Sequence, residues 1–589
     1  MKTAKNKWNT REIKVGNVLI GGDNPVRIQS MTTSNTRDIE ATIDQIVKLA
    51  DQGCEIARVT VQGKKEALAC EEIKNGLVKR GYTIPIVADI HFYPPAAMLV
   101  ADFVDKVRVN PGNYIDKRAV FKQITYSDLD YAHEIEKIEE GFSPLVQKCK
   151  QRKIAMRIGT NHGSLSDRIM NRYGDTAFGM VESALEFANV CRKNDYHNFL
   201  FSMKASNPLV MIQAYRLLVA KMMELGWDYP LHLGVTEAGI GEDGRVKSAV
   251  GIGSLLLDGI GDTIRCSLTE DPWFEIDPCK RLAKLKNENN LPYPLEVGRK
   301  KHTSTRFNLH PDGSVFLKLN SGETFIEADN DQTPDVLVVD KLTDQVQIKD
   351  IPILSLSDLK NIAYVTEGVF EGTSDYILLE LSGNKVEQAR DFFYNLKERG
   401  INIPVILIGR YQCSEKDLVI RASAEIGSLL ADGFGEGICI VGEYSQKLKV
   451  DLSFRILQAA RMRSSKTEFI ACPGCGRTLF DLQSVTQKIR SKTSHLPGVK
   501  IAIMGCIVNG PGEMADADFG YVGSRSNKID LYVGKTCVEK NIDESIAVDK
   551  LIALIKSHGC WVSQPTIDLE TEKGGAKKLP LAISTSHQD

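Results

Sequence analysis

The sequence predicts an α/β protein whose N-terminal half is a (β/α)8 TIM barrel. Eight short, apolar, β-branched runs recur within residues 26–290, and a segment long enough to form a helix follows each one. The runs are continuously apolar rather than alternating, which is typical of parallel strands buried on both faces. Eight such units match a (β/α)8 barrel, whereas a doubly wound sheet seldom needs eight similar units.

The predicted strands end in polar residues. They cover residues 26–32, 56–61, 84–91, 106–110, 154–161, 199–206, 230–237 and 263–267. In a barrel of this kind, the functional groups gather at the C-terminal ends of the strands. The polar residues at these ends are Arg58, His91, Arg108, Asn110, Arg157, Asn161, Lys204, Glu237, Arg265 and Ser267.

Cations dominate this set of strand ends. Four arginines, one lysine and one histidine accompany a single carboxylate, Glu237. A guanidinium pairs with two phosphate oxygens at once, and a lysine adds a point charge. We therefore expect the barrel mouth to bind a small, highly anionic ligand such as a diphosphate, with Glu237 as the candidate acid or base. Solvated charge at the start of a loop explains any one of these residues, but not the whole set.

Residues 291–450 repeat part of the barrel. Residues 252–261 (IGSLLLDGIG) align without gaps with residues 426–435 (IGSLLADGFG), an offset of 426 − 252 = 174. At the same offset, three further identities follow: Glu224 with Glu398, Gly226 with Gly400, and Pro230 with Pro404. Such self-similarity indicates internal duplication. A linker is expected at residues 287–292, where Asn, Glu and Pro cluster.

The second copy does not keep the functional groups of the first. At the offset of 174, Lys204 aligns with Leu378, Glu237 with Tyr411, and Arg265 with Cys439. We therefore expect an inserted, barrel-derived spacer domain over residues 291–450. A regulatory ligand site is the alternative, and it has less support because the anion-binding groups are gone.

Residues 451–589 read as a small α/β domain with two cysteine motifs. The first is CPGCGR at residues 472–477, and the second is GCIVNGPGE at residues 505–513. Two thiolates on a Pro/Gly turn can chelate one metal centre, and a glycine-rich loop lets backbone amides approach sulfides. A structural zinc site needs four closed ligands, and no fourth cysteine stands at ligand spacing. An iron–sulfur cluster on Cys472, Cys475 and Cys506, with Glu513 as a weaker fourth ligand, is the preferred interpretation over three ordinary buried cysteines.

These motifs resemble those of the 4-hydroxy-3-methylbut-2-enyl diphosphate synthase family of the non-mevalonate isoprenoid pathway. Both cysteine motifs match, and so do barrel segments such as ADIHF, VRVNPGN, RIGTNHGSL, LGVTEAG and IGDTIRCSL. The inserted domain and a long loop over residues 114–152, with an acidic run at 134–140, resemble the long form of the family found in plants and some bacteria. His162 replaces the alanine of the short form and is expected to pack or hydrogen-bond rather than to catalyse.

The resemblance implies an oxidoreductase with a 4Fe-4S cluster on Cys472, Cys475, Cys506 and Glu513. The implied reaction is reductive dehydroxylation and ring opening of 2-C-methyl-D-erythritol 2,4-cyclodiphosphate to (E)-4-hydroxy-3-methylbut-2-enyl diphosphate, with two electrons. Glu237 would transfer the proton. The implied phosphate-binding residues are Arg58, His91, Arg108, Arg157, Asn161, Lys204, Arg265 and Ser267. No nucleotide-binding fingerprint is evident, so a separate ferredoxin or flavodoxin is expected to donate the electrons.

Three alternatives come from other classes. A radical S-adenosylmethionine enzyme needs a Cys-x3-Cys-x2-Cys run, which the sequence lacks. In a zinc-stabilised aldolase-type barrel, Lys204 would form a Schiff base, and the zinc-loaded protein would be colourless. A non-enzymatic cluster scaffold would not explain the charged strand ends. Fold analogy alone does not choose between these alternatives.

The composition limits which binding partners and which cellular compartment are expected. The net charge of −2 gives no basic surface for binding nucleic acid. No apolar run reaches the roughly 18 residues that a membrane span requires. Thirteen cysteines without a signal peptide favour a reducing, cytoplasmic setting. In the short form of the family, one subunit's barrel faces the partner's cluster domain. A homodimer and closure within one chain therefore both remain open.

Overall fold

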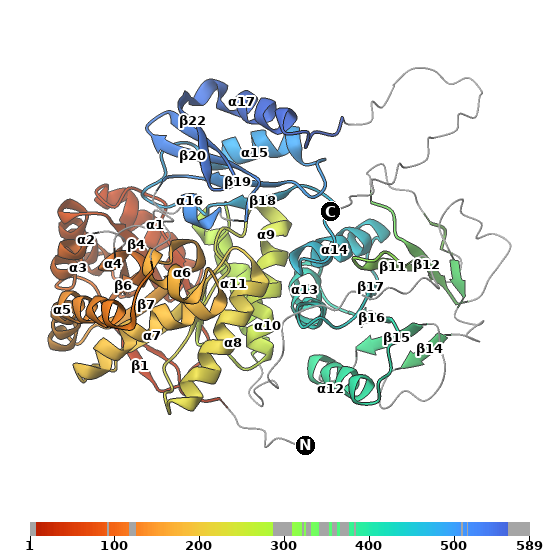
Figure 1. The fold of residues 1–589 in the computed structure, drawn as a ribbon, viewed down its shortest axis with the longest axis horizontal. Helices are drawn as coiled ribbons and strands as arrows, with labels where there is room; N and C mark the ends of the chain where they lie inside the picture. Colours follow the sequence, from red (N-terminus) through yellow and green to blue (C-terminus); the bar gives the residue numbers. More distant parts are fainter. Residues whose placement is uncertain are drawn as a thin grey trace.

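The computed structural model describes residues 8–90, 93–116, 125–286, 309–320, 323–325, 332–340, 353–355, 362–365, 376–381, 385–507, 510–514 and 516–563. The chain forms a barrel, a middle domain beside it, and a C-terminal domain that lies over one end of the barrel (Figure 1). None of the described helices is long and apolar enough to cross a bilayer.

The predicted eight-stranded parallel barrel is confirmed. Its sheet runs in the order β8-β7-β6-β5-β4-β3-β10-β9, and a parallel bridge between Phe201 and Leu231 joins the two ends. The strands are β3 (Arg27–Met31), β4 (Ile56–Val61), β5 (Ile86–Ile90), β6 (Lys106–Val109), β7 (Ala155–Asn161), β8 (Phe199–Lys204), β9 (His232–Leu233) and β10 (Thr263–Ile264). Each lies within a run predicted from the sequence.

Helices surround the barrel (Figure 1). The longer ones are α1 (Ile39–Asp51), α2 (Lys64–Lys79), α3 (Pro94–Val100), α5 (Asp128–Arg152), α7 (Ala177–Lys193), α8 (Pro208–Glu224), α9 (Gly241–Ser248) and α11 (Ile276–Ala283). Short helical segments complete the connections: α4 (Pro111–Tyr114), η1 (His162–Ser164), α6 (Asp167–Tyr173), the π-turn η2 (Ala249–Gly253), α10 (Ser254–Leu257) and η3 (Pro272–Glu275).

Helix α5 occupies most of the segment that the sequence analysis treated as a long loop, so that prediction was wrong. A capping box starts the helix: the Ser127 hydroxyl accepts from the backbone N–H of Asp130, and the Asp130 carboxylate accepts from the backbone N–H of Ser127. The helix ends at Lys153, which has the left-handed φ of 56°. The acidic run at 134–140 lies on this helix.

A hairpin that the sequence did not predict closes the N-terminal end of the barrel. It consists of β1 (Ile13–Val15) and β2 (Val18–Ile20), which pair antiparallel. Its side chains Ile13, Val15 and Ile20 pack against the first inward residues of four strands, Ile56, Val87, Ala155 and Leu200. This apolar floor seals one end of the barrel and leaves the other end for polar groups.

The middle domain is built on a seven-stranded, all-parallel sheet in the order β13-β12-β11-β17-β16-β15-β14. The strands are β11 (Ser314–Lys318), β12 (Val336–Val339), β13 (Ile353–Ser355), β14 (Ile362–Val365), β15 (Tyr376–Leu381), β16 (Val405–Arg410) and β17 (Gly437–Val441). Its first strand, β11, pairs with its last, β17, just as β3 pairs with β10 in the barrel. Three helices pack on the sheet: α12 (Lys385–Glu398), α13 (Glu415–Ala431) and α14 (Gln446–Ala459).

The predicted division at residue 450 lies inside helix α14 and needs correction. Val450, Phe454 and Leu457 of this helix belong to the same apolar core as the middle-domain strands. The middle domain therefore extends to about residue 460. The linker expected at residues 287–292 lies outside the described residues.

The duplicated segments pack against each other across the boundary between barrel and middle domain. A Cβ on Gly253 would lie 2.4 Å from the Cβ of Ala424, and a Cβ on Gly427 would lie 2.7 Å from Val250. Both contacts obey the offset found in the sequence, because 250 + 174 = 424 and 253 + 174 = 427. The two copies thus meet about an approximate two-fold axis, with glycines that allow the helices to approach closely.

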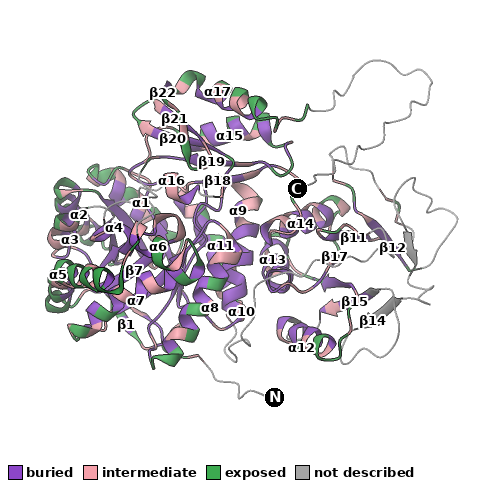
Figure 2. Ribbon diagram, viewed as in Figure 1, coloured by how far each residue is buried: buried purple, intermediate pink, exposed green. Residues whose placement is uncertain are grey.

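Four buried charges obey the same symmetry. They are Arg216 and Asp258 from the barrel, and Arg390 and Asp432 from the middle domain, where 216 + 174 = 390 and 258 + 174 = 432. Each arginine pairs with both aspartates, at 2.7–2.8 Å. Figure 2 shows the helices α10 and α13 buried at this boundary, whereas outer helices such as α5 and α17 (Glu544–Ser557) carry exposed residues.

The C-terminal domain has a five-stranded sheet in the order β18-β19-β20-β21-β22, parallel over the first three strands and antiparallel over the last two. Its strands are β18 (Glu468–Ala471), β19 (Lys500–Met504), β20 (Phe519–Arg525), β21 (Lys528–Val533) and β22 (Thr536–Asp543). Helices α15 (Leu482–Thr493) and α17 contribute to its core, and the short α16 (Gly510–Glu513) lies towards the barrel (Figure 1). The two cysteine motifs follow β18 and β19, so both lie at one edge of this sheet.

Candidate active site

The two cysteine motifs lie over the C-terminal ends of the barrel strands of the same chain. Ala238 forms a parallel bridge with Ala471, and the Thr269 hydroxyl donates to the Ala471 carbonyl oxygen at 3.1 Å. The second loop meets the barrel backbone to backbone: a Cβ on Gly163 would lie 2.2 Å from the carbonyl carbon of Gly512. The barrel mouth and both cysteine loops therefore enclose one site.

The three motif cysteines are close to one another and to the barrel. Cys475 is buried, while Cys472 and Cys506 are partly buried, and none forms a disulfide. Burial raises the pKa of the Cys472 thiol, and the nearby Cys475, Glu237 and Cys506 raise it further. In the part of the chain that the structure describes, no three side chains converge as ligands of a single metal ion. In a 4Fe-4S cluster, each thiolate instead binds a different iron.

Glu513 joins the cysteine loops to the barrel. Its side chain is buried and accepts a hydrogen bond of 2.7 Å from Asn161 Nδ2. Burial raises the pKa of Glu513 well above its ordinary value, and the neighbouring Glu237 adds to the effect. Glu513 therefore lies in the barrel mouth close to Glu237, and its role as a fourth ligand beside the cysteines stays a prediction.

Three cations of the mouth lack an ion-paired carboxylate in the part of the chain that the structure describes. They are Arg58, Arg157 and Lys204, and none of them forms an ion pair with a carboxylate among the described residues. Arg58 directs Nε and Nη2 at the Met31 sulfur, at 3.1 and 2.8 Å. Burial lowers the pKa of Arg58 to about 10 and lowers the pKa of Lys204 well below its ordinary value, and neighbouring cations contribute to both shifts. Such a group of mutually repelling charges favours an anionic ligand.

The other two predicted arginines are held by carboxylates that the sequence analysis missed. Arg108 pairs with Asp89 at 3.1 Å and also donates to Asn161 Oδ1 at 3.2 Å. Arg265 donates two hydrogen bonds of 2.9 Å to Glu275. The mouth is thus not served by one carboxylate as predicted, because Asp89 and Glu275 lie in it as partners of arginines.

Arg477 is a further residue that the sequence analysis did not assign to the site. It belongs to the first cysteine motif, is buried, and reaches across to Asp89 at 3.3 Å. Asp89 therefore links a barrel arginine to the cysteine loop. The signal was present in the sequence, because Arg477 lies two residues after Cys475 and Asp89 ends the apolar part of its strand.

Glu237 is the remaining carboxylate of the barrel mouth. It is 3% exposed, and its Oε2 has no hydrogen-bond partner among the described residues. Its φ of 47° lies in the left-handed region, which a non-glycine residue adopts at a cost and most often at functional sites. Burial raises the pKa of Glu237, although Thr236, Lys204 and Arg265 oppose that shift.

The other predicted residues lie as follows. His91 is outside the described residues. Ser267 is buried in the mouth, and its carbonyl oxygen accepts from the N–H of Ala238. Asn110 donates to the Ser164 hydroxyl at 2.8 Å. His162 Nε2 lies 3.2 Å from a carboxylate oxygen of Asp175.

Comparison with known proteins identifies relatives over nearly the whole chain. Residues 10–280 match the GcpE TIM-barrel domain, and residues 468–557 match the GcpE protein C-terminal domain. The chain is 57% identical to 4-hydroxy-3-methylbut-2-en-1-yl diphosphate synthase (flavodoxin) of Protochlamydia amoebophila, over 95% of this chain and 97% of that protein. The chloroplastic ferredoxin-type enzymes of Oryza sativa subsp. japonica and Arabidopsis thaliana are 47% and 46% identical, and cover 94% and 96% of this chain and 88% and 89% of their own lengths.

Proposed function

The chain belongs to the 4-hydroxy-3-methylbut-2-en-1-yl diphosphate synthase family, and from this premise we propose how its residues divide the work. The protein is an oxidoreductase of isoprenoid biosynthesis, of the EC 1.17.7 class. It forms its product by a reductive conversion. The substrate proposed for this chain is 2-C-methyl-D-erythritol 2,4-cyclodiphosphate.

Cys472, Cys475, Cys506 and Glu513 are proposed to hold a 4Fe-4S cluster. The donor set supports this assignment, since Cys472 lies near Cys475, Cys506 and Glu237, and Glu513 is buried in the same barrel mouth, also near Glu237. When bound, such a cluster supplies single electrons and an iron whose carboxylate ligand exchanges more readily than a thiolate. The electron donor is proposed to be a flavodoxin or a ferredoxin, the two donors named for the relatives.

The cationic mouth is proposed to bind the two phosphates of the substrate. Arg58, Arg157 and Lys204 support this role most directly, because none of them forms an ion pair with a carboxylate among the described residues. Arg forks fit phosphate oxygens. The remaining proposed contacts are His91, Arg108, Asn161, Arg265 and Ser267.

Glu237 is proposed as the group that transfers a proton to the departing hydroxyl. Loss of a hydroxyl as water requires a proton, and three carboxyls lie in the mouth among the described barrel residues. Asp89 and Glu275 are engaged by arginines, whereas Glu237 Oε2 has no partner among the described residues. Glu237 also precedes Ala238, the residue that pairs with the strand end before Cys472.

The middle domain is proposed to be a barrel-derived spacer without chemistry of its own. Leu378 and Cys439, at the positions equivalent to Lys204 and Arg265, lie in a small apolar cluster with Phe316 and Ile406. These apolar side chains offer nothing to a phosphate.

The observation that carries the proposal is the closure of both cysteine loops over a cationic barrel mouth. Its test is anaerobic purification, followed by iron and sulfide analysis and the EPR spectrum of the reduced protein with and without the cyclic diphosphate. We expect iron and sulfide, and a signal that changes when substrate is added. A colourless, zinc-loaded protein would instead support the aldolase-type alternative.

A second measurement tests the acid. Glu237→Gln is expected to keep the cluster and substrate binding but to lose turnover, because the amide cannot supply the proton. Full activity in this variant would remove Glu237 from the mechanism without touching the assignment of the cluster.

A further inference from the structure

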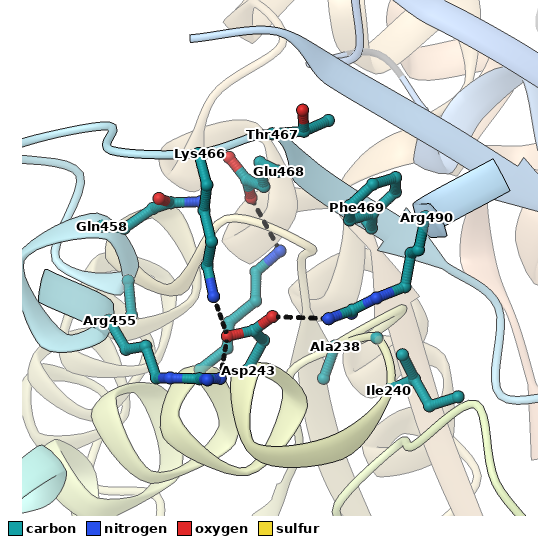
Figure 3. A pocket seen from close by; sticks show the side chains of 13 residues that line it. Ala238, Ile240, Asp243, Arg455, Gln458, Lys466, Thr467, Glu468, Phe469 and Arg490 are labelled. Carbon is teal, nitrogen blue, oxygen red and sulfur yellow. Dashed lines mark hydrogen bonds and ion pairs between the residues drawn. The ribbon is translucent and has the colours of Figure 1, made fainter. Parts of the chain in front are cut away.

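The three domains meet at one ionic junction beside the active site (Figure 3). Its centre is Asp243, in the first turn of helix α9 of the barrel. The Asp243 carboxylate accepts from Lys466 at 2.7 Å, from Arg490 at 3.1 Å, and from Arg455. Arg455 belongs to helix α14 of the middle domain, Lys466 to the segment before β18, and Arg490 to α15. One carboxylate therefore ties the barrel to both other domains.

A second ion pair from the same helix reaches the strand that carries the first cysteine. Lys247, one turn after Asp243, pairs with Glu468 at 2.9 Å, and Glu468 also pairs with Arg461. Glu468 is the first residue of β18, whose last residue, Ala471, precedes Cys472. Lys247 and Glu468 are both largely buried, so solvent screens this pair little.

The contact that joins the two halves of the active site lies beside these two anchors. Ala238 pairs with Ala471, so Glu237 and Cys472 flank the same bridge on its two sides. The barrel chain enters α9 three residues after Ala238. A shift of α9 relative to β18 would therefore change the separation of Glu237 and Cys472 directly.

The junction holds the three domains together rather than binding a ligand. The pocket that it lines offers only about 40 Å³, enough for a few water molecules but not for a metabolite. Burial opposes the ionisation of Asp243, but Lys466, Arg455 and Arg490 outweigh it and hold the pKa of Asp243 below its ordinary value. Without the Asp243 charge, three cations from three segments would face one another.

We propose that Asp243 and Lys247 are positioning residues, which hold Glu237 of the barrel at its working distance from Cys472 of the cluster domain. This inference rests on the function proposed above, because it assumes that Glu237 and the cysteine loops act on one substrate. It goes beyond that function by assigning the alignment to helix α9, which contributes no group to the chemistry.

The test compares Asp243→Asn with a matched control, Glu270→Gln. Glu270 pairs with Arg245 of the same helix at 2.7 Å, and neither partner forms an ion pair with the other two domains among the described residues. In Asp243→Asn, we expect normal iron and sulfide, substrate affinity within about twofold, and a kcat lower by on the order of 100-fold, as for a misplacement of about 1 Å. The EPR change on adding substrate should be lost as well. Glu270→Gln should keep both kcat and the EPR change.

A second variant covers the case in which Asp243→Asn does not fold. Glu468→Gln removes the partner of Lys247 without touching Asp243, and it should show the same loss of kcat at unchanged substrate affinity. Equal losses in Glu468→Gln and Glu270→Gln, a change in KM alone, or wild-type kcat would each overturn the inference. A wild-type protein whose EPR signal ignores substrate would instead count against the proposed function itself.

Discussion

The buried charge quartet between the barrel and the middle domain allows a quantitative prediction. The Asp258 and Asp432 side chains are 0% exposed, and those of Arg216 and Arg390 are 10% and 7% exposed. Asp258→Asn removes two of the four ion pairs and leaves two buried guanidiniums with one carboxylate. Breaking a buried pair in this way costs about 3–5 kcal/mol, because a buried charge is left without compensation.

A second substitution should restore part of this loss. Asp258→Asn combined with Arg390→Met removes one charge of each sign and keeps the pair between Arg216 and Asp432 at 2.7 Å. The double variant should therefore be less destabilised than the sum of the two single variants, with a coupling free energy of about 1–3 kcal/mol. Replacing a buried ion pair by apolar atoms can itself be close to neutral.

Hydrogen exchange read by mass spectrometry suits this multidomain chain, because it reports local opening free energies without assuming a single transition. Peptides from α13 and α12 are compared with a peptide from α5, which is remote from the interface. Glu224→Gln serves as the control, since its pair with Lys221 is exposed and is worth at most about 0.5 kcal/mol. Additive single effects, or an Asp258→Asn variant that exchanges like the control, would refute the reasoning.

Three further predictions concern the site and the spacer. Gly163→Ala would place a methyl group against the backbone of Gly512 and should lower kcat without loss of iron, whereas Gly63→Ala, with no contact nearer than 3.4 Å, should be silent in the same kinetic assay. Glu275→Gln removes the carboxylate that accepts two hydrogen bonds from Arg265. In steady-state kinetics, it should raise the KM for the cyclic diphosphate about tenfold, the equivalent of about 1.4 kcal/mol. An unchanged KM would show that Arg265 needs no such support. Leu378→Lys should unfold the middle domain, because it buries a charge in an apolar cluster. Leu378→Met should keep the thermal midpoint and the activity. A soluble, active lysine variant would contradict the packing described above.

The sequence predicted the barrel well because its signal is local. Each strand is a largely apolar run, and the polar residues of the mouth lie within it, as Arg58 does in β4, or just after it, as Glu237 does after β9. The sequence did not predict the β1–β2 hairpin, because each of its strands has only three residues and packs against residues of the barrel strands that are distant in sequence. Helix α5 was mistaken for a loop because Gly141 and Pro144 interrupt its pattern, although Ser127 and Asp130 already form a capping signature.

The candidate site was predicted as a set of charges but not as a set of pairs. Arg108 and Arg265 were expected to face the ligand, and the structure instead gives each of them a carboxylate of its own. Glu275 comes from the short turn η3 and reaches the mouth only through tertiary packing. No pattern of strands and loops shows which of several buried cations is already neutralised.

The approximate two-fold axis between the duplicated segments has a consequence for how this interface can change. In a symmetric homodimer, one altered codon changes the contact twice, and dilution pulls the two halves apart. Here both halves belong to one polypeptide, so their effective concentration does not fall on dilution. Each half also has its own codons, so Arg216 and Arg390 are free to diverge one at a time.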